Sequence, residues 1–208
     1  SDFKIVMAEF HDFFISQEFQ EDASEIGWSS GSIEASVKVR EAEDWGELKR
    51  NLGQQREKHD VLAFRGGDHE LNRKVFSDPR MDVVLHPGKG RKDSGMNHVD
   101  AEKAAENDIA IGFSLKEVPE DQKRQSHKLN KWRNNLKLCE KYNVHYIITT
   151  EAENFSELRA PRDIGSIIDS LGYNGRRAVS YSPERIIEKN MKAKDDSQVR
   201  PGHEVLDE

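Results

Sequence analysis

Cysteine is almost absent from this sequence: Cys139 is the only one in 208 residues. A lone cysteine cannot form an internal disulfide or a cysteine metal cluster. Cys139 continues a helical spacing with Leu129, Trp132 and Leu136, and this pattern predicts a place in the core.

Long apolar runs are also missing. No window of eighteen apolar residues exists, so the sequence predicts no membrane-spanning helix. The opening residues, "SDFKIVMAEFHDFF", lack the charged and apolar regions of a secretory signal. We therefore expect a soluble, cytoplasmic protein without a membrane partner.

An excess of positive charge is lacking overall, since the formal net charge is -7. Phosphate neutralisation by Lys and Arg drives nucleic-acid binding, so this balance at first argues against such a partner. However, residues 1–60 hold 7 Lys and Arg against 14 Asp and Glu, and residues 61–208 hold 25 of each. Local basic surfaces can therefore form beyond residue 60, where the local field decides what docks.

Short apolar runs alternate with helical patterns along most of the chain. The runs "DVLAF", "DVVL" and "VHYII" are continuously apolar, which is typical of parallel strands covered by helices on both faces. Together with residues 10–15, 32–40, 108–115 and 177–181 they give about seven strand units. This α/β pattern predicts a TIM-like barrel over residues 1–190, with a doubly wound sheet as the alternative. The polar residues 191–208 are expected to form a mobile tail.

Cationic residues follow several of the predicted strands. In either fold, the loops at the carboxyl ends of strands build the site. The candidate phosphate-binding cations in these loops, and so the candidate contacts of a nucleic acid, are Arg65, Lys89, Arg91, Lys92, Arg159 and Arg162. His86 and His98 flank the glycine-rich loop "PGKGRKDSGMN", where they have either a binding or a structural role. The helix predicted over residues 120–142 has a basic face, which we interpret as solvated surface.

Motifs for catalysis by the chain itself are not present. There is no nucleophile elbow, phosphate-binding P-loop or dinucleotide glycine fingerprint. Metal-dependent phosphoesterase barrels open with two histidines one residue apart, but here a single His11 precedes Asp12. We predict no catalytic residue and no metal site in this chain.

Four segments together resemble one family, the archaeal ribonuclease P protein component 3. They are "DVLAFRGGDHELNRKVFSDPRMDVVLHP", "RKDSGMNHVDAEKAAENDIAIGFSL", "YIITTEAENFSELRAPRDIGSIIDSLG" and "SPERIIEKN", in the family's order. The resemblance implies a TIM-like barrel related to polymerase-and-histidinol-phosphatase (PHP) domains, without their metal centre.

The same resemblance implies a protein subunit of ribonuclease P, the endonuclease that removes the 5′ leader from precursor tRNA. In that ribonucleoprotein the RNA subunit hydrolyses the phosphodiester bond with divalent ions (Mg²⁺). A second protein subunit, Pop5-like, forms a tight complex with component 3. This chain would bind and support the catalytic RNA and need no cofactor of its own.

Two other functions remain as alternatives. One is a stand-alone, metal-dependent PHP-type phosphoesterase that uses His11, Asp12, His86 and His98. The other is a barrel that only holds proteins together, with its basic loops merely solvated.

Overall fold

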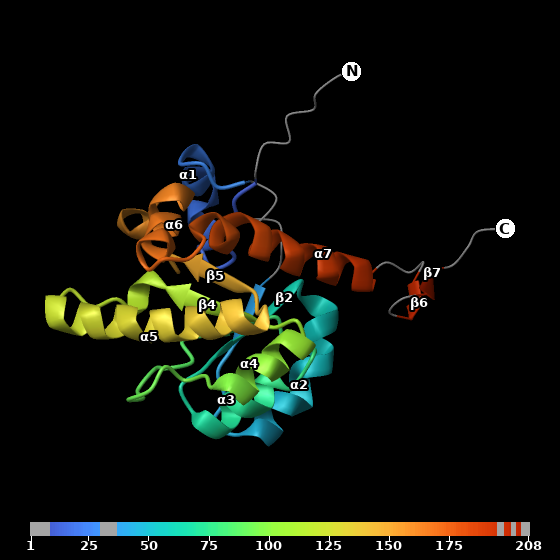
Figure 1. Ribbon diagram of the computed structural model, residues 1–208. Coiled ribbons are helices and arrows are strands. Elements are labelled where there is room, and N and C mark those ends of the chain that lie inside the picture. The colour runs from blue at the N-terminus through green and yellow to red at the C-terminus, as the bar shows by residue number, and fades with distance from the viewer. Residues whose placement is uncertain (1–8, 30–36, 195–197, 201–202, 205–208) are drawn as a thin grey trace, which may run out of the picture.

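A parallel β-sheet forms the centre of the computed structural model, which describes residues 9–29, 37–194, 198–200 and 203–204 (Figure 1). Its strands are β1 Val37–Arg40, β2 Val61–Arg65, β3 Val83–Leu85, β4 Ala110–Ser114 and β5 Tyr146–Thr149. They lie in chain order, β1-β2-β3-β4-β5, and each neighbouring pair is parallel. All five carboxyl ends therefore meet at one edge of the sheet, where ligand sites of α/β folds lie.

Helices connect the strands: α2 Trp45–Lys58, α3 His69–Phe76, α4 His98–Glu106 and α5 Gln122–Tyr142. Each begins at a side chain that caps it, since Asp44, Asp68, Asn97 and Asp121 accept a hydrogen bond from the first turn. Before β1 lies α1 Gln20–Glu25, and after β5 come α6 Pro161–Ser170 and α7 Ser182–Lys194. Two short strands, β6 Gln198–Arg200 and β7 His203–Glu204, pair antiparallel.

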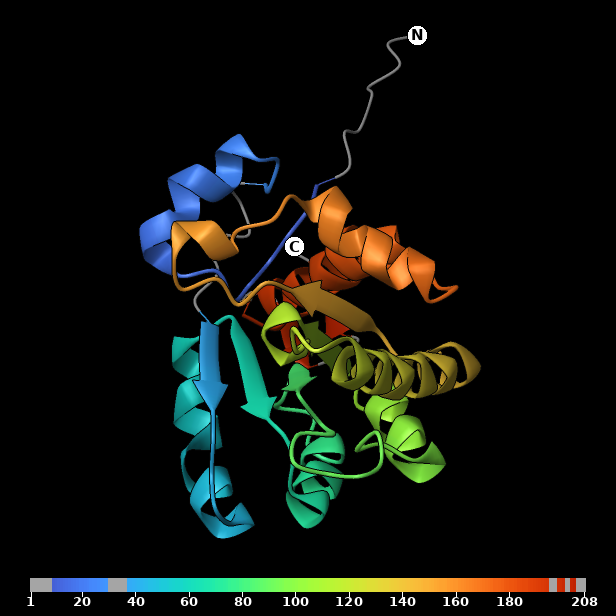
Figure 2. The same cartoon turned by 90° about the vertical axis from the view of Figure 1, so that its left-hand side faces the viewer.

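The sheet is buried on both faces, as the apolar strands predicted. Successive side chains point to opposite faces, so Leu62 and Phe64 belong to a large core that includes Trp132 and Cys139 of α5. Val61 and Ala63 belong to a smaller core closed by Phe13 and by Ile186 of α7. Figure 2 shows α7, in red, beside the strands and α2 to α5 around them. The predicted core position of Cys139 is confirmed, because it is fully buried.

The strand count differs from the prediction of about seven. Within the described residues the parallel sheet has five strands, with β1 and β5 at its edges and not joined into a closed barrel. The strand order follows the chain without a reversal, so the doubly wound alternative, which reverses its strand order, is contradicted. Most of the segment expected as a strand over 32–40 lies outside the described residues, and β1 occupies its end.

Two segments predicted as strands have other structures for identifiable reasons. Residues 177–181 form a π-helical turn that leads into α7, because a short apolar run fits a buried helix as well as a strand. Near residues 10–15, the His11 amide donates to the Val179 carbonyl at 2.8 Å, but no ladder follows. The Asp12 carboxylate instead accepts hydrogen bonds from Thr149 and Thr150 at the end of β5.

The predicted boundary at residue 190 lies inside α7, which continues to Lys194. Much of the predicted tail over 191–208 lies outside the described residues, so its mobility stays a prediction. Among the described helices, none combines the length and the apolar character that crossing a membrane requires.

Candidate functional site

Charged side chains from all five strand ends form one connected ion cluster. Arg65 ends β2, His86 follows β3, Glu117 closes the 3-10 turn after β4, and Glu151 follows β5. Glu41, just after β1, contacts Arg65 from the outside, with Arg65 Nε 3.3 Å from Glu41 Oε1. The parallel sheet brings these residues together although they are spread over more than one hundred positions of the chain.

His86 lies between two carboxylates at the centre of the cluster. Its Nε2 is 2.8 Å from Glu151 Oε2, and its Nδ1 is 3.2 Å from Glu117 Oε2. The other oxygens of both glutamates are also paired: Arg65 Nη2 lies 2.6 Å from Glu151 Oε1, and Lys128 of α5 binds Glu117 Oε1. The side chains of His86 and Glu151 are each 4% exposed, so this is a buried network of alternating charge.

The network shifts the pKa values of its members toward their charged forms. Burial opposes protonation of His86, but the hydrogen bonds and charges of Glu117 and Glu151 outweigh it and raise the histidine pKa. Burial likewise opposes ionisation of Glu151, yet His86, Ser114 and Arg65 lower the pKa of this carboxyl to about 2. The pKa of Glu117 is also lowered, against burial, by His86 and Lys128. Each ring nitrogen of His86 therefore lies beside a carboxylate that favours its protonated form.

The backbone is strained at the two residues that form the centre of this network. His86 has φ of 52° and Glu151 has φ of 49°, in the left-handed region that non-glycine residues rarely adopt. The other non-glycine residues with positive φ in the described chain, Asp108 and Asn143, lie where α4 and α5 end, where this conformation is common. His86 and Glu151 instead directly follow strands and face each other, which is typical of functional sites.

A cavity of about 400 Å³ opens beside the network. Its walls contain Arg65, His86, Glu117 and Glu151, the glycines Gly88 and Gly90, and the lysines Lys89, Lys116, Lys128 and Lys131. Five fixed cations and two carboxylates line it, although Arg65 also pairs with Glu41 and Lys116 pairs with Glu153 and Glu157 outside the wall. The cavity is thus lined mainly by cations, on a chain whose net charge is -7.

The basic loop over residues 87–97 rests on both α3 and α5. Asn72 of α3 donates to the carbonyls of Pro87 and Gly95, at 2.8 and 3.2 Å. From α5, Asn135 donates to the Ser94 carbonyl at 2.9 Å, and Lys131 donates to the Arg91 carbonyl. In Figure 1 this loop lies beside α5. The loop and the basic face of α5, which the sequence presented as two separate features, therefore form one continuous surface.

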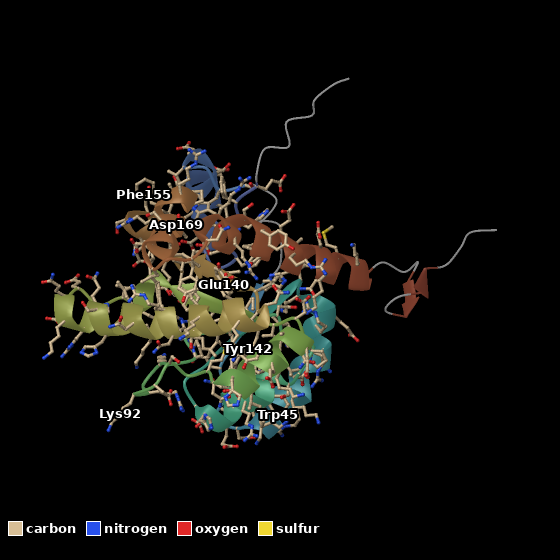
Figure 3. The ribbon with its side chains drawn as sticks, viewed as in Figure 1. Trp45, Lys92, Glu140, Tyr142, Phe155 and Asp169 are labelled. Atoms are coloured by element: carbon tan, nitrogen blue, oxygen red, sulfur yellow. The ribbon has the colours of Figure 1, made fainter. Side chains whose placement is uncertain are left out.

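The predicted site residues divide into those that the structure gathers and those that it separates. Arg65, His86 and Lys89 line the cavity. Arg91 lies in the same loop, but its guanidinium binds Asp93 through two hydrogen bonds of 2.7 and 2.6 Å. Lys92 points away from the body of the molecule in Figure 3.

The remaining predicted residues are exposed but do not line the cavity. Arg159 donates to the carbonyls of Ser156 and Leu158, so it braces the loop before α6. Arg162 is exposed in the first turn of α6. His98 is the first residue of α4 and is exposed, whereas His86 is buried.

Sequence reasoning missed four functional residues: Glu117, Glu151, Lys128 and Lys131. The two glutamates follow predicted strands, so their position at a strand end was the available signal. The two lysines lie three residues apart and share a helix face, but the pattern did not indicate which face meets the loop.

The donors of the metal-enzyme alternative do not fit a metal ion. Both ring nitrogens of His86 already lie beside carboxylate oxygens of this chain, at 3.2 Å from Glu117 and 2.8 Å from Glu151. Asp12 uses both oxygens on Thr149 and Thr150, and His98 is exposed on α4. Among the described residues, no three His, Cys, Asp or Glu side chains are placed to hold a metal ion.

A parallel sheet with a cationic strand-end cavity defines the class as an α/β protein with a basic strand-end edge. The family described as RNase P subunit p30 matches residues 32–195, so the chain belongs to this family. Ribonuclease P protein component 3 of Methanococcoides burtonii is 35% identical over 160 residues, which cover 75% of this chain and 65% of that protein. The protein of the same name from Methanosarcina barkeri is 34% identical, over 76% of this chain and 66% of that one. The chain thus spans slightly less than two thirds of the length of these relatives.

A solved structure is also similar. A chain in a cryo-EM structure of archaeal ribonuclease P with mature tRNA superposes with a TM-score of 0.75 at 26% identity. The match covers 96% of this chain and 87% of that chain. The likeness therefore extends over nearly the whole fold, including the edge that carries the ion cluster.

Proposed function

We propose that this chain is a protein subunit of ribonuclease P, the ribonucleoprotein that generates mature tRNA 5′ ends by cutting off the 5′ leader. The observation that carries the proposal is its family membership, RNase P subunit p30, over residues 32–195. The similar chain in an archaeal ribonuclease P structure with mature tRNA supports it further. A cationic edge on an acidic protein fits a subunit that meets RNA on one side.

In this proposal the chain supports catalysis without performing it. The strand-end edge offers lysines and arginines, which bind phosphates, and its carboxylates Glu117 and Glu151 are committed to ion pairs. The catalytic RNA, with Mg²⁺, would hydrolyse the phosphodiester bond. In this division of labour the chain is part of an endonuclease but has no catalytic residue and no cofactor of its own. We place the particle in the cytoplasm as part of the same proposal.

The partners we infer are the ribonuclease P RNA, precursor tRNA through the assembled particle, and a Pop5-like protein subunit. The predicted RNA contacts are Lys89, Arg91 and Lys92 in the loop, together with Arg65, Arg159 and Arg162. The loop residues are the best supported, because the loop is held against the basic helix α5. Arginine and lysine both suit this task, since arginine grips two phosphate oxygens and lysine acts as a point charge.

Precursor-tRNA cleavage by the particle tests this function. The tagged chain is purified from its own cells, and the sample is assayed before and after ribonuclease treatment that destroys co-purifying RNA. We expect a product with the mature 5′ end, and loss of this activity with the RNA. Cleavage that survives removal of the RNA would support the alternative of a metal-dependent phosphoesterase. Absence of cleavage at every stage would support a barrel that only holds proteins together.

A further inference from the structure

We propose that the cavity of about 400 Å³ at the carboxyl ends of β2 to β5 is a binding site for a phosphate group. The inference deepens the proposed function and rests on it for one point, namely that RNA is the source of the phosphate. The ligand chemistry itself follows from the walls of the cavity. The volume lies within the range of small-molecule sites, so a phosphate together with its attached sugar can enter.

The cations around the cavity come from separate elements and converge. Arg65 ends β2, Lys89 lies in the loop after β3, Lys116 follows β4, and Lys128 and Lys131 are on α5. Because Lys128 and Lys131 are three residues apart, they lie on one side of the helix. Such convergence of point charges onto one space matches the spread negative charge of a phosphate.

The two carboxylates in the wall are neutralised, so they do not repel an anion. Glu151 binds Arg65 and His86, and Glu117 binds His86 and Lys128. The cluster also fixes Arg65 and Lys128 in place, which lowers the entropy lost when a ligand binds. Its strained centre at His86 and Glu151 is a second, independent sign that this edge is built for binding.

Several donors in the wall remain available for a ligand. Lys89 has an exposed side chain with no ion-pair partner in the part of the chain that the structure describes. An ammonium has three donors, and Lys128 and Lys131 each use one on the contacts described above. Gly90 adds wall without a side chain, and since no atom lies within 4 Å of the place where its Cβ would be, a ligand can approach the backbone closely there.

Titration with inorganic phosphate tests the site in the purified full chain, at ionic strength held constant with sodium chloride. Binding is followed by amide chemical shifts and by calorimetry. We expect saturable binding, with shifts in residues 86–92 and 116–131. Lys89→Ala and Lys131→Ala should each weaken binding by about tenfold, the worth of one charge-assisted hydrogen bond. The matched control is Lys137→Ala, exposed on α5 about half a turn away from Lys128 around the helix, which should leave binding unchanged.

A second arm identifies the source of the phosphate. A short single-stranded RNA that displaces bound inorganic phosphate, and that loses affinity in Lys89→Ala, supports RNA as the source. Phosphate binding that such RNA cannot displace supports the site but assigns it to a free phosphate compound. Absence of saturable phosphate binding, or equal weakening by Lys89→Ala and Lys137→Ala, overturns the proposal.

The two proposals can fail separately. Phosphate binding is measured on the chain alone, whereas precursor-tRNA cleavage is measured on the particle. Cleavage together with no phosphate binding would leave the subunit function standing and remove the site. Phosphate binding with no cleavage in any preparation would do the reverse.

Discussion

At the scale of single residues, the dominant feature is a histidine held between two glutamates. Burying a charge costs free energy unless the charge is paired. Removal of one partner of a buried pair leaves the other charge buried without compensation, and this destabilises the fold. Glu151 contacts Arg65 through Oε1 and His86 through Oε2, while Arg65 Nη1 and His86 Nε2 lie 3.2 Å apart. Loss of the Glu151 charge should therefore destabilise the fold more than loss of a carboxylate in a typical surface ion pair.

Glu151→Gln should lower the free energy of unfolding by about 3 kcal/mol, because it leaves Arg65 and His86 without their shared counter-charge. The control is Glu153→Gln, two residues away, whose side chain is 78% exposed and pairs with Lys116. That change should cost less than about 1 kcal/mol. Urea denaturation of both variants at pH 7 makes the measurement, and equal costs would contradict a special role for the buried network.

The stability of the protein should depend on pH through His86. Its pKa is raised above the ordinary 6.5, so its contribution is complete below pH 6.5 and is lost as the pH rises through the folded pKa. Glu151 has a pKa lowered from 4.5 to about 2, so its contribution is complete above pH 4.5 and is lost toward pH 2. Both contributions are complete together between pH 4.5 and 6.5.

The difference in unfolding free energy between the wild type and His86→Gln should therefore shrink above pH 6.5, by at most about 1.4 kcal/mol per pH unit. The control His145→Gln should show a difference that stays constant above pH 6.5, because burial lowers the pKa of His145 despite the nearby Asp108, so its contribution is already complete there. Denaturation curves from pH 6 to 9 measure both differences. A His86 difference that does not change with pH would mean that its imidazole is neutral in the folded protein.

At the scale of elements, the loop over residues 87–97 decides where the cations lie. It turns back on itself so closely that a side chain at Gly95, where φ is 83°, would place Cβ 2.0 Å from the Pro87 carbonyl oxygen. Asn72 binds the carbonyls of both Pro87 and Gly95 and holds the two ends together. The position of Lys89 and Arg91 therefore depends on a residue of α3 that carries no charge.

Gly95→Ala should open this loop and cost more than about 3 kcal/mol, since both the contact with Pro87 and the positive φ oppose it. Gly90→Ala is the matched control: its φ is also positive, at 70°, but no atom lies within 4 Å of the added carbon. It should cost about 1 kcal/mol from backbone strain alone. Thermal unfolding measures the stability of both variants, and phosphate binding is a second readout of the loop. A Gly95→Ala protein as stable as Gly90→Ala would contradict the close turn.

At the scale of the whole molecule, charge is separated along the chain and gathered in space. The first 60 residues hold all of the excess acidity, whereas the loop after β3 and α5 hold adjacent cations. Long-range repulsion between an acidic protein and RNA weakens binding, so a local basic surface must supply the attraction. Association with RNA should therefore be strongly salt-dependent.

The logarithm of the RNA association constant should fall linearly with the logarithm of the salt concentration. Each lost phosphate contact should reduce the magnitude of this slope by about 0.7 to 1. The double variant Lys89→Ala/Lys92→Ala should lose about two such contacts without preference for RNA sequence. Lys103→Ala, which pairs with Glu106 on α4, is the control and should keep the slope. Filter binding from 50 to 300 mM salt measures it, and an unchanged slope in the double variant would remove the loop from the RNA surface. Arg162→Ala, in the same assay, tests whether the surface extends to α6.

The sequence by itself determined the elements that depend on local pattern. The apolar runs at β2, β3, β4 and β5 are strands because they are buried on both faces, and Arg65, His86 and Lys89 follow strands as predicted. Residues 177–181 were misjudged, since a short apolar run satisfies a buried helix equally well. The family resemblance over most of residues 60–190 could likewise be recognised from the sequence, because local motifs in a fixed order carry it.

The tertiary structure alone decided the composition of the site. Glu117, Glu151, Lys128 and Lys131 meet His86 and Lys89 because parallel strands bring their carboxyl ends to one edge and α5 packs against the loop. No local spacing contains that information, since these four partners lie 31 to 65 residues after His86 and the facing side of a helix is set by packing. The raised pKa of His86 follows the same logic, because it comes, against burial, from the neighbouring carboxylates of Glu117 and Glu151 and not from its position in the sequence.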